Sequence, residues 1–246
     1  MPARRLGRRT GLLHLALAGA PDDPAFAPEP YHAMHQQSIY QGARALLAKT
    51  FQMLRRQARG LPDETRALAD AVLAREKAVD DRFREVTRRK YDLDRIRCHG
   101  DLHLGQVLFL GDDFLIIDFE GEPARRLNER RYKRAGLRDV TGMLRSFGYV
   151  AESTLRLGPF RSQDVATLEP WARAWVAWVS AAYLGEYLHT VRGTRLLPKG
   201  DADRDRLLDF YTLEKCVYEI AYEMMNRPTW LAIPLRGLLQ ILDGGV

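Results

Sequence analysis

Apolar residues recur at helical spacing along most of the chain, and this pattern predicts a mainly α-helical protein. Six ranges carry apolar side chains three or four positions apart, as an amphipathic helix requires: 4–20, 31–59, 62–86, 137–154, 164–192 and 203–226. In the first range, Leu6, Leu12, Leu13 and Leu17 are the expected core residues. Four prolines between positions 21 and 30 predict a loop after it.

The helical period is lost near Arg95. Residues 106–119 instead read as two short apolar runs on either side of Gly111-Asp112-Asp113, which is typical of a β-hairpin. The sequence therefore predicts an α+β fold that is mainly α, with one small β-hairpin in the middle.

Composition and charge narrow the choice of partners. Of the 246 residues, 46% are apolar and 28% are charged, and no uninterrupted apolar run is long enough to cross a bilayer, so we expect no membrane partner. The net charge of +6 comes from dispersed basic residues, so we expect no nucleic-acid partner.

Two distant cysteines, Cys98 and Cys216, indicate a reducing, cytoplasmic location. Cys98 is expected to be a small buried apolar group.

Two short motifs flank the predicted hairpin: His99-Gly100-Asp101 before it and Asp118-Phe119-Glu120 after it. Phosphoryl transfer needs a carboxylate that orients the acceptor hydroxyl, and oxygen ligands for Mg²⁺. Asp101 can provide the first. Gln106, five positions later, and Asp118, at the end of a strand, can provide the second. The order and spacing of these residues predict a kinase-like phosphotransferase that uses ATP and Mg²⁺.

The first motif allows two other interpretations. His99 and His103 have the spacing of a zinc pair on a helix, but the glycines beside them disfavour a helix and no third ligand is evident. Gly100 and Gly105 have the glycine spacing of a P-loop, but Gln106 and Val107 stand where that motif needs Lys and Ser or Thr.

Four segments resemble bacterial maltokinase, a kinase-like family related to aminoglycoside phosphotransferases and often fused to trehalose synthase. They are 97–107, 116–125, 137–147 and 213–228. The resemblance implies transfer of the γ-phosphate of ATP to the anomeric hydroxyl of maltose, giving maltose 1-phosphate for α-glucan (glycogen) synthesis. It implies maltose and ATP as substrates, and a trehalose synthase domain as a candidate partner.

The same resemblance implies roles for individual residues. Asp101 would be the catalytic base, and Gln106 and Asp118 would hold Mg²⁺. His99 would help to place the sugar, with Glu120 also at the substrate, and Asp139 would brace the catalytic loop from a helix.

A polar stripe on the last long helix is a second candidate for sugar binding. At about 100° per residue, Lys215, Tyr218 and Tyr222 share one side of the helix, away from its apolar face. Tyrosine rings and hydroxyls with Lys215 and Glu219 suit a disaccharide. A solvent-facing or domain-packing stripe is the alternative.

No glycine-rich strand or phosphate-binding lysine precedes His99, so the chain resembles a kinase C-terminal lobe with the N-terminal lobe absent. Within this single lobe we expect a helical bridge (1–90), the catalytic loop and metal-binding hairpin (91–125) and a helical subdomain (126–246). Such a chain is expected to be weakly active unless another chain supplies the lobe. A non-catalytic remnant, a sugar-binding partner and an aminoglycoside- or choline-type kinase remain alternatives.

Overall fold

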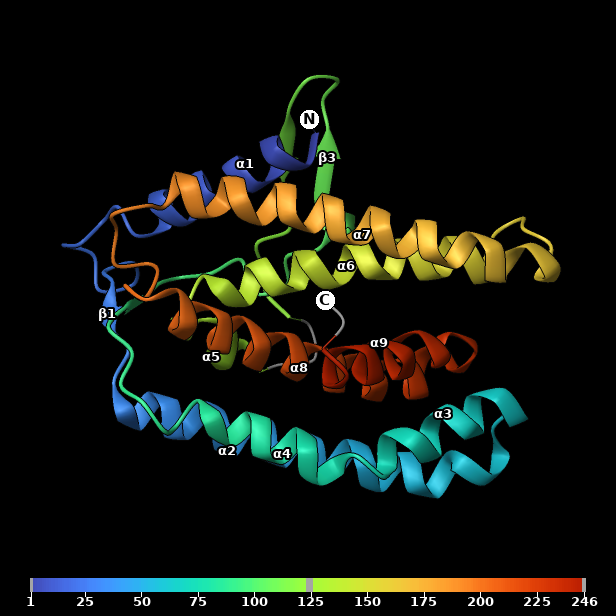
Figure 1. Cartoon of the computed structure of the whole chain (residues 1–246). Helices are drawn as coiled ribbons and strands as arrows, with labels where there is room; N and C mark the ends of the chain where they lie inside the picture. Colours follow the sequence, from blue (N-terminus) through green and yellow to red (C-terminus); the bar gives the residue numbers. More distant parts are fainter. Residues whose placement is uncertain (1, 123–125, 245–246) are drawn as a thin grey trace. The chain divides into compact units, whose positions relative to one another are not determined.

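The computed structural model describes residues 2–122 and 126–244, and it is mainly helical (Figure 1). The chain forms two compact units, each built from two stretches of sequence. The first unit is Met1–Tyr31 with Tyr91–Leu208, and the second is His32–Lys90 with Asp209–Val246.

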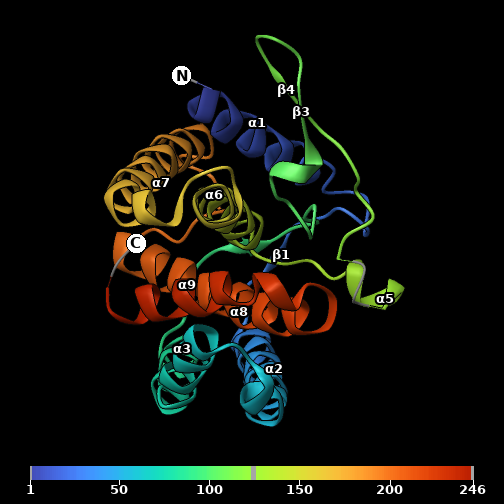
Figure 2. The same cartoon turned by 90° about the vertical axis from the view of Figure 1, so that its right-hand side faces the viewer.

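The described residues of the first unit form three long helices, the first part of a fourth and two small sheets. Its elements are α1 (Pro2–Leu17), β1 (Glu29–Pro30), β2 (Asp94–Arg95), η2 (Leu104–Gln106), β3 (Val107–Phe109), β4 (Phe114–Ile116), α5 (Leu127–Arg130), α6 (Leu137–Leu157), α7 (Ser162–Thr190) and the start of α8 (Asp201–Asn226). Helix α7 packs along both α1 and α6, as Figures 1 and 2 show.

Glycine, rather than leucine, forms the contact between α1 and α7. Gly7 and Gly11 are buried against α7, and a Cβ at Gly11 would lie 2.7 Å from the Thr190 side chain. Leu6 is buried as predicted, but Leu12 is 38% exposed, so the expected face of this helix was partly wrong. The absence of side chains at Gly7 and Gly11 allows the two helices to approach closely. A pattern of large apolar residues does not indicate such a contact.

The predicted hairpin is present. Strands β3 and β4 pair antiparallel, with Val107 opposite Ile116 and Phe109 opposite Phe114. Gly111 has a φ of 90°, a conformation that glycine adopts without strain. A second antiparallel pair, β1 with β2, was not predicted, because two residues per strand leave no periodic pattern.

The second unit is built from helices and two 3₁₀ turns. Its elements are α2 (Ala33–Gln57), η1 (Ala58–Gly60), α3 (Asp63–Leu73), α4 (Glu76–Glu85), the rest of α8, η3 (Pro228–Trp230) and α9 (Ala232–Leu242). Helix α2 packs on α4, and α3 packs on α9. The helix predicted over 62–86 is divided after Leu73, although Val72, Val79 and Phe83 are all buried.

The predicted fold class is confirmed: the described residues are mainly helical, with small antiparallel sheets. Among these residues, no helix has the length and apolar character to cross a membrane.

Candidate active site

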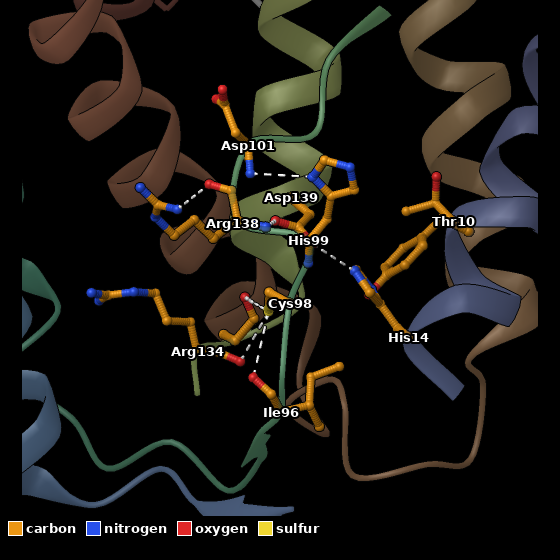
Figure 3. Close-up of polar contacts among 12 residues, drawn as sticks. Thr10, His14, Ile96, Cys98, His99, Asp101, Arg134, Arg138 and Asp139 are labelled. Carbon is orange, nitrogen blue, oxygen red and sulfur yellow. Dashed lines mark hydrogen bonds and ion pairs between the residues drawn. The ribbon is translucent and has the colours of Figure 1, made fainter. Parts of the chain in front are cut away.

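A buried carboxylate holds the backbone of the loop that carries Asp101. Asp139, in the first turn of α6, accepts hydrogen bonds from the backbone N–H of His99 (2.7 Å) and of Gly100 (2.9 Å). Gly100 has a φ of 90°, so it turns the chain sharply just before Asp101. Figure 3 shows the Asp101 carboxylate pointing away from this network. Asp139 thus holds the backbone of the loop, and the Asp101 carboxylate lies on its other side, with Oδ2 3.9 Å from His103 Nε2.

A histidine on α1 completes the support of Asp139. His14 is fully buried, with Nε2 3.2 Å from Asp139 Oδ2 and Nδ1 3.0 Å from the Tyr187 hydroxyl on α7. Burial raises the pKa of Tyr187 well above its ordinary value, so the phenol keeps its proton. The geometry fits a Tyr187 hydroxyl that donates to Nδ1 and a His14 Nε2–H that donates to Asp139.

The charge of Asp139 is stabilised despite its position in the interior. Burial acts to raise its pKa, but the hydrogen bond from His14, the electrostatic interactions with His14 and His99 and the N–H of Gly100 act against this. The net result is a pKa of Asp139 below its ordinary value. A charged acceptor strengthens both backbone hydrogen bonds of the loop.

His99 connects the two motifs. Its ring is buried, its Nε2–H donates to the backbone carbonyl of Ile117 (2.8 Å), and Nδ1 accepts from the N–H of Asp101 (3.4 Å). The ring centroid also lies 5.0 Å from that of Phe119. Both ring nitrogens therefore make hydrogen bonds within the protein, and they join the two motifs. The role in placing the sugar that is expected of His99 stays a prediction.

The two predicted metal ligands contact each other. The amide Nε2–H of Gln106 donates to Asp118 Oδ2 at 2.9 Å. Asp118 has a φ of 65°, and it is the only non-glycine residue with positive φ in the described part of the chain. Such a backbone costs roughly 1–3 kcal/mol and often marks functional sites. The pair leaves the Gln106 amide oxygen and the second Asp118 oxygen outside this hydrogen bond.

A buried ion pair ties the Asp101 loop to the segment after Asp118. Arg138 donates to the carbonyl of Gly100 (2.9 Å) and to Glu122 (3.0 Å), which is 3% exposed. Gly100 and Gly121 allow the two segments to approach, since a Cβ on Gly100 would lie 3.3 Å from the Gly121 Cα. Sequence reasoning missed Arg138, Glu122 and His14. Of these three residues, only Arg138 had a signal in the sequence, which is its position next to Asp139.

The remaining predicted residues have varied surroundings. Glu120 is exposed and lies 3.4 Å from Arg130, while Glu219 is buried. The Lys215 ammonium lies 4.9 Å from the centre of the Tyr218 ring, which stacks on Tyr222 at 6.2 Å. Lys215, Tyr218, Glu219 and Tyr222 belong to the second unit, whereas Asp101, Gln106 and Asp118 belong to the first.

Cys98 is half-buried, so the expectation of a buried apolar residue holds only in part. Its sulfur lies 3.6 Å from the carbonyl of Ile96 and 3.5 Å from that of Arg134, as Figure 3 shows. Burial raises the pKa of the thiol, which keeps it protonated.

A metal at the Gln106–Asp118 pair would need ligands from elsewhere. No group of three or more His, Cys, Asp or Glu residues that could hold a metal occurs within 2–122 and 126–244. Mg²⁺ in phosphotransferases is held by one or two protein oxygens together with phosphate oxygens. An amide oxygen beside a carboxylate fits that kind of site.

The chain is similar in sequence to known phosphotransferases. Residues 2–121 match the phosphotransferase enzyme family. The chain is 26% identical to a glucosamine kinase of Streptacidiphilus jiangxiensis over 98% of its own length and 49% of the relative. It is 28% identical to a glucosamine kinase of Mycolicibacterium smegmatis over 60% of its own length and 34% of the relative.

Solved structures give the same result. A glucosamine kinase crystal structure superposes with a TM-score of 0.79 at 25% identity, covering 99% of this chain and 54% of that one. A glucosamine kinase in complex with glucosamine, ADP and inorganic phosphate gives 0.78 over 99% and 55%.

The chain thus spans about half the length of the curated relatives it matches, or less. Residues 2–121 are thus similar in sequence to the phosphotransferase enzyme family, and the chain is similar in sequence and in fold to glucosamine kinases.

Proposed function

We propose that this chain carries the phosphoryl-transfer site of an ATP-dependent sugar kinase. The observation that carries the proposal is the Gln106–Asp118 contact, held beside a loop whose Asp101 carboxylate points outward. Asp101 would orient the acceptor hydroxyl and take its proton, a role worth about 10²–10⁴-fold in rate. Asp139, His99 and Arg138 would fix the loop in this geometry.

Gln106 and Asp118 would hold Mg²⁺ through the amide oxygen and a carboxylate oxygen. When bound there, Mg²⁺ would supply positive charge that offsets the negative charge developing on the phosphates during transfer. Use of ATP is supported by the ADP in the related glucosamine kinase structure. The strained backbone of Asp118 would keep its carboxylate in one direction before any ligand binds.

Glucosamine is the first candidate acceptor, since the two curated relatives and the two solved structures described above are glucosamine kinases. Maltose is the second candidate, because the C-terminal segment 213–228 resembles maltokinase. The stacked Tyr218 and Tyr222 rings with Lys215 offer apolar faces and a cation, which suit either sugar.

The test is a long incubation with ATP and Mg²⁺ and, in turn, glucosamine, maltose, an aminoglycoside and choline, with sugar phosphate detected by mass spectrometry and ³¹P NMR. We expect a phosphorylated sugar whose formation falls at least about 100-fold in Asp101→Asn. Asp112→Asn, an exposed carboxylate at the hairpin tip, is the matched control and should keep full activity. Product that does not depend on Asp101, or phosphate on choline or the aminoglycoside alone, would overturn the proposal.

A further inference from the structure

The outward side of α7 carries three exposed tryptophans. Trp171 is 75% exposed, Trp175 is 45% exposed and Trp178 is 66% exposed. They are spaced by four and three residues, so they lie on one side of the helix. The buried Tyr183 and Tyr187 lie on the opposite side at the same 100° per residue, facing the interior of the first unit. These rings therefore point away from the unit that α7 helps to build.

The outward stripe is apolar along its whole length. From Trp171 to Gly185 it consists of Trp171, Ala174, Trp175, Trp178, Ala181 and Gly185, all of them exposed and none of them charged. Isolated exposed apolar residues are common on monomers, but a continuous patch marks an interaction surface. A helix with apolar residues on all sides is normally covered on all sides. Within the described part of the chain, no helix is suited to cross a membrane.

We propose that this stripe binds the same stripe of a second copy of the chain, with the two α7 helices antiparallel. Large and small residues alternate along it in a self-complementary order. An antiparallel pairing can place Trp171 opposite Ala181 of the partner subunit and Trp178 opposite Ala174 of the partner subunit. A two-fold axis then repeats both contacts, as an interface between identical surfaces requires. A large residue that faces a small one lets the two surfaces interdigitate.

The area available agrees with a modest dimer. A tryptophan offers about 150–250 Å², so the exposed parts of the three rings supply roughly 300–450 Å² per copy. A standard interface needs about 800 Å² per partner. The rings supply about half of this, and the alanines and flanking side chains would supply the rest. We therefore expect a dissociation constant in the micromolar range, with the tryptophans as its main energetic contributors.

Sedimentation velocity of the full chain across the micromolar range tests the proposal. Wild-type protein should pass from monomer to dimer as its concentration rises. Trp171→Glu should weaken the dimer by at least about 30-fold, because an interface tryptophan that anchors binding contributes about 2 kcal/mol or more. Leu157→Glu, an exposed leucine at the end of α6, is the control and should leave the dimer unchanged. Far-UV circular dichroism establishes that each variant is folded.

Exchanging a large side chain with a small one distinguishes this pairing from non-specific apolar association. Ala174→Trp adds apolar surface, so a merely sticky patch would associate more strongly, whereas the proposed pairing would clash with Trp178 of the partner subunit and weaken. Trp178→Ala should also weaken the dimer. The double variant exchanges the two sizes and should restore it.

A wild-type chain that stays monomeric at all concentrations would overturn the proposal. So would stronger association of Ala174→Trp, or a dimer that survives Trp171→Glu. Flotation with phosphatidylcholine vesicles supplies a further criterion: binding of the monomer to vesicles through these tryptophans would make a lipid surface the occupant and would also overturn the second-copy proposal.

Discussion

The Nε2 atom of His14, on α1, lies 3.2 Å from Oδ2 of Asp139, on α6, and almost nothing of either side chain is exposed. The same Oδ2 accepts the N–H of His99, so the first helix of the chain supports the proposed catalytic loop through a single carboxylate. The loop geometry therefore depends on a residue 87 positions before Asp101.

Replacing His14 should destabilise the first unit. His14→Ala leaves the buried Asp139 with fewer hydrogen bonds and the Tyr187 hydroxyl without its acceptor, and it opens a cavity. We expect the free energy of unfolding to fall by about 2–4 kcal/mol in urea denaturation. His189→Ala, at an exposed histidine near the end of α7, is the control and should change it by less than about 0.5 kcal/mol. Equal effects of the two substitutions would refute the role of His14.

Sequence alone predicted the parts of this site that are local in the chain. The hairpin follows from two apolar runs around Gly111, and Asp118 from its position at the end of the second run. His14 carries no local signal of this kind. Nothing in the sequence pairs it with Asp139, because the contact depends on the packing of α1 against α7, where Gly7 and Gly11 are buried. The partners of the His99 ring could not be predicted either, since they are a carbonyl and a backbone N–H, which no side-chain pattern records.

Asp113 provides a test by pH. Arg9 on α1 hydrogen-bonds to Asp113 at the hairpin tip, with Nε 2.8 Å from Oδ1, and with the N–H of Phe114 it lowers the pKa of Asp113 to about 2. Arg9→Ala should raise that pKa toward 3.8, as read from the carboxyl ¹³C shift in an NMR titration. Arg5→Ala should raise it much less, because Arg5 acts only through its charge.

The sign of the accompanying stability effect is fixed by linkage. The folded pKa lies below the unfolded one, so the contribution of Asp113 is present above about pH 4 and is lost as the pH falls toward 2. The stability advantage of wild type over Arg9→Ala should shrink over that range. We expect this stability advantage to be small, since the Arg9–Asp113 pair is solvent-exposed. An advantage that grows on acidification would contradict this account.

Asp118 should show a conflict between stability and function. Its φ of 65° costs a non-glycine residue about 1 kcal/mol, which glycine avoids. Asp118→Gly should therefore be more stable than Asp118→Ala by about 1 kcal/mol in urea denaturation, while both lose Mg²⁺-dependent phosphoryl transfer. At Asp112, whose φ is not positive, the glycine variant should be no more stable than the alanine variant. If the glycine variant were more stable than the alanine variant at both positions, the difference at Asp118 would not come from backbone strain.

Two glycines of α6 allow the contact between this helix and the catalytic loop to be tested with one substitution. A Cβ on Gly142 would lie 2.5 Å from the carbonyl oxygen of Leu102, next to Asp101, whereas a Cβ on Gly148 would meet nothing within 4 Å. Gly142→Ala should lower the free energy of unfolding by about 1–3 kcal/mol, because backbone must move to relieve the overlap. Gly148→Ala should raise it by about 0.5–1 kcal/mol through helix propensity.

The two effects have opposite signs for the same chemical change in the same helix, so a general effect of alanine cannot produce both. Gly142→Ala should also slow phosphoryl transfer, since the displaced carbonyl belongs to the loop that carries Asp101. Gly148→Ala should leave the rate unchanged. If Gly142→Ala proved as stable and as active as Gly148→Ala, α6 would not press on the catalytic loop at Leu102, and the rigid support proposed for Asp101 would be lost with it.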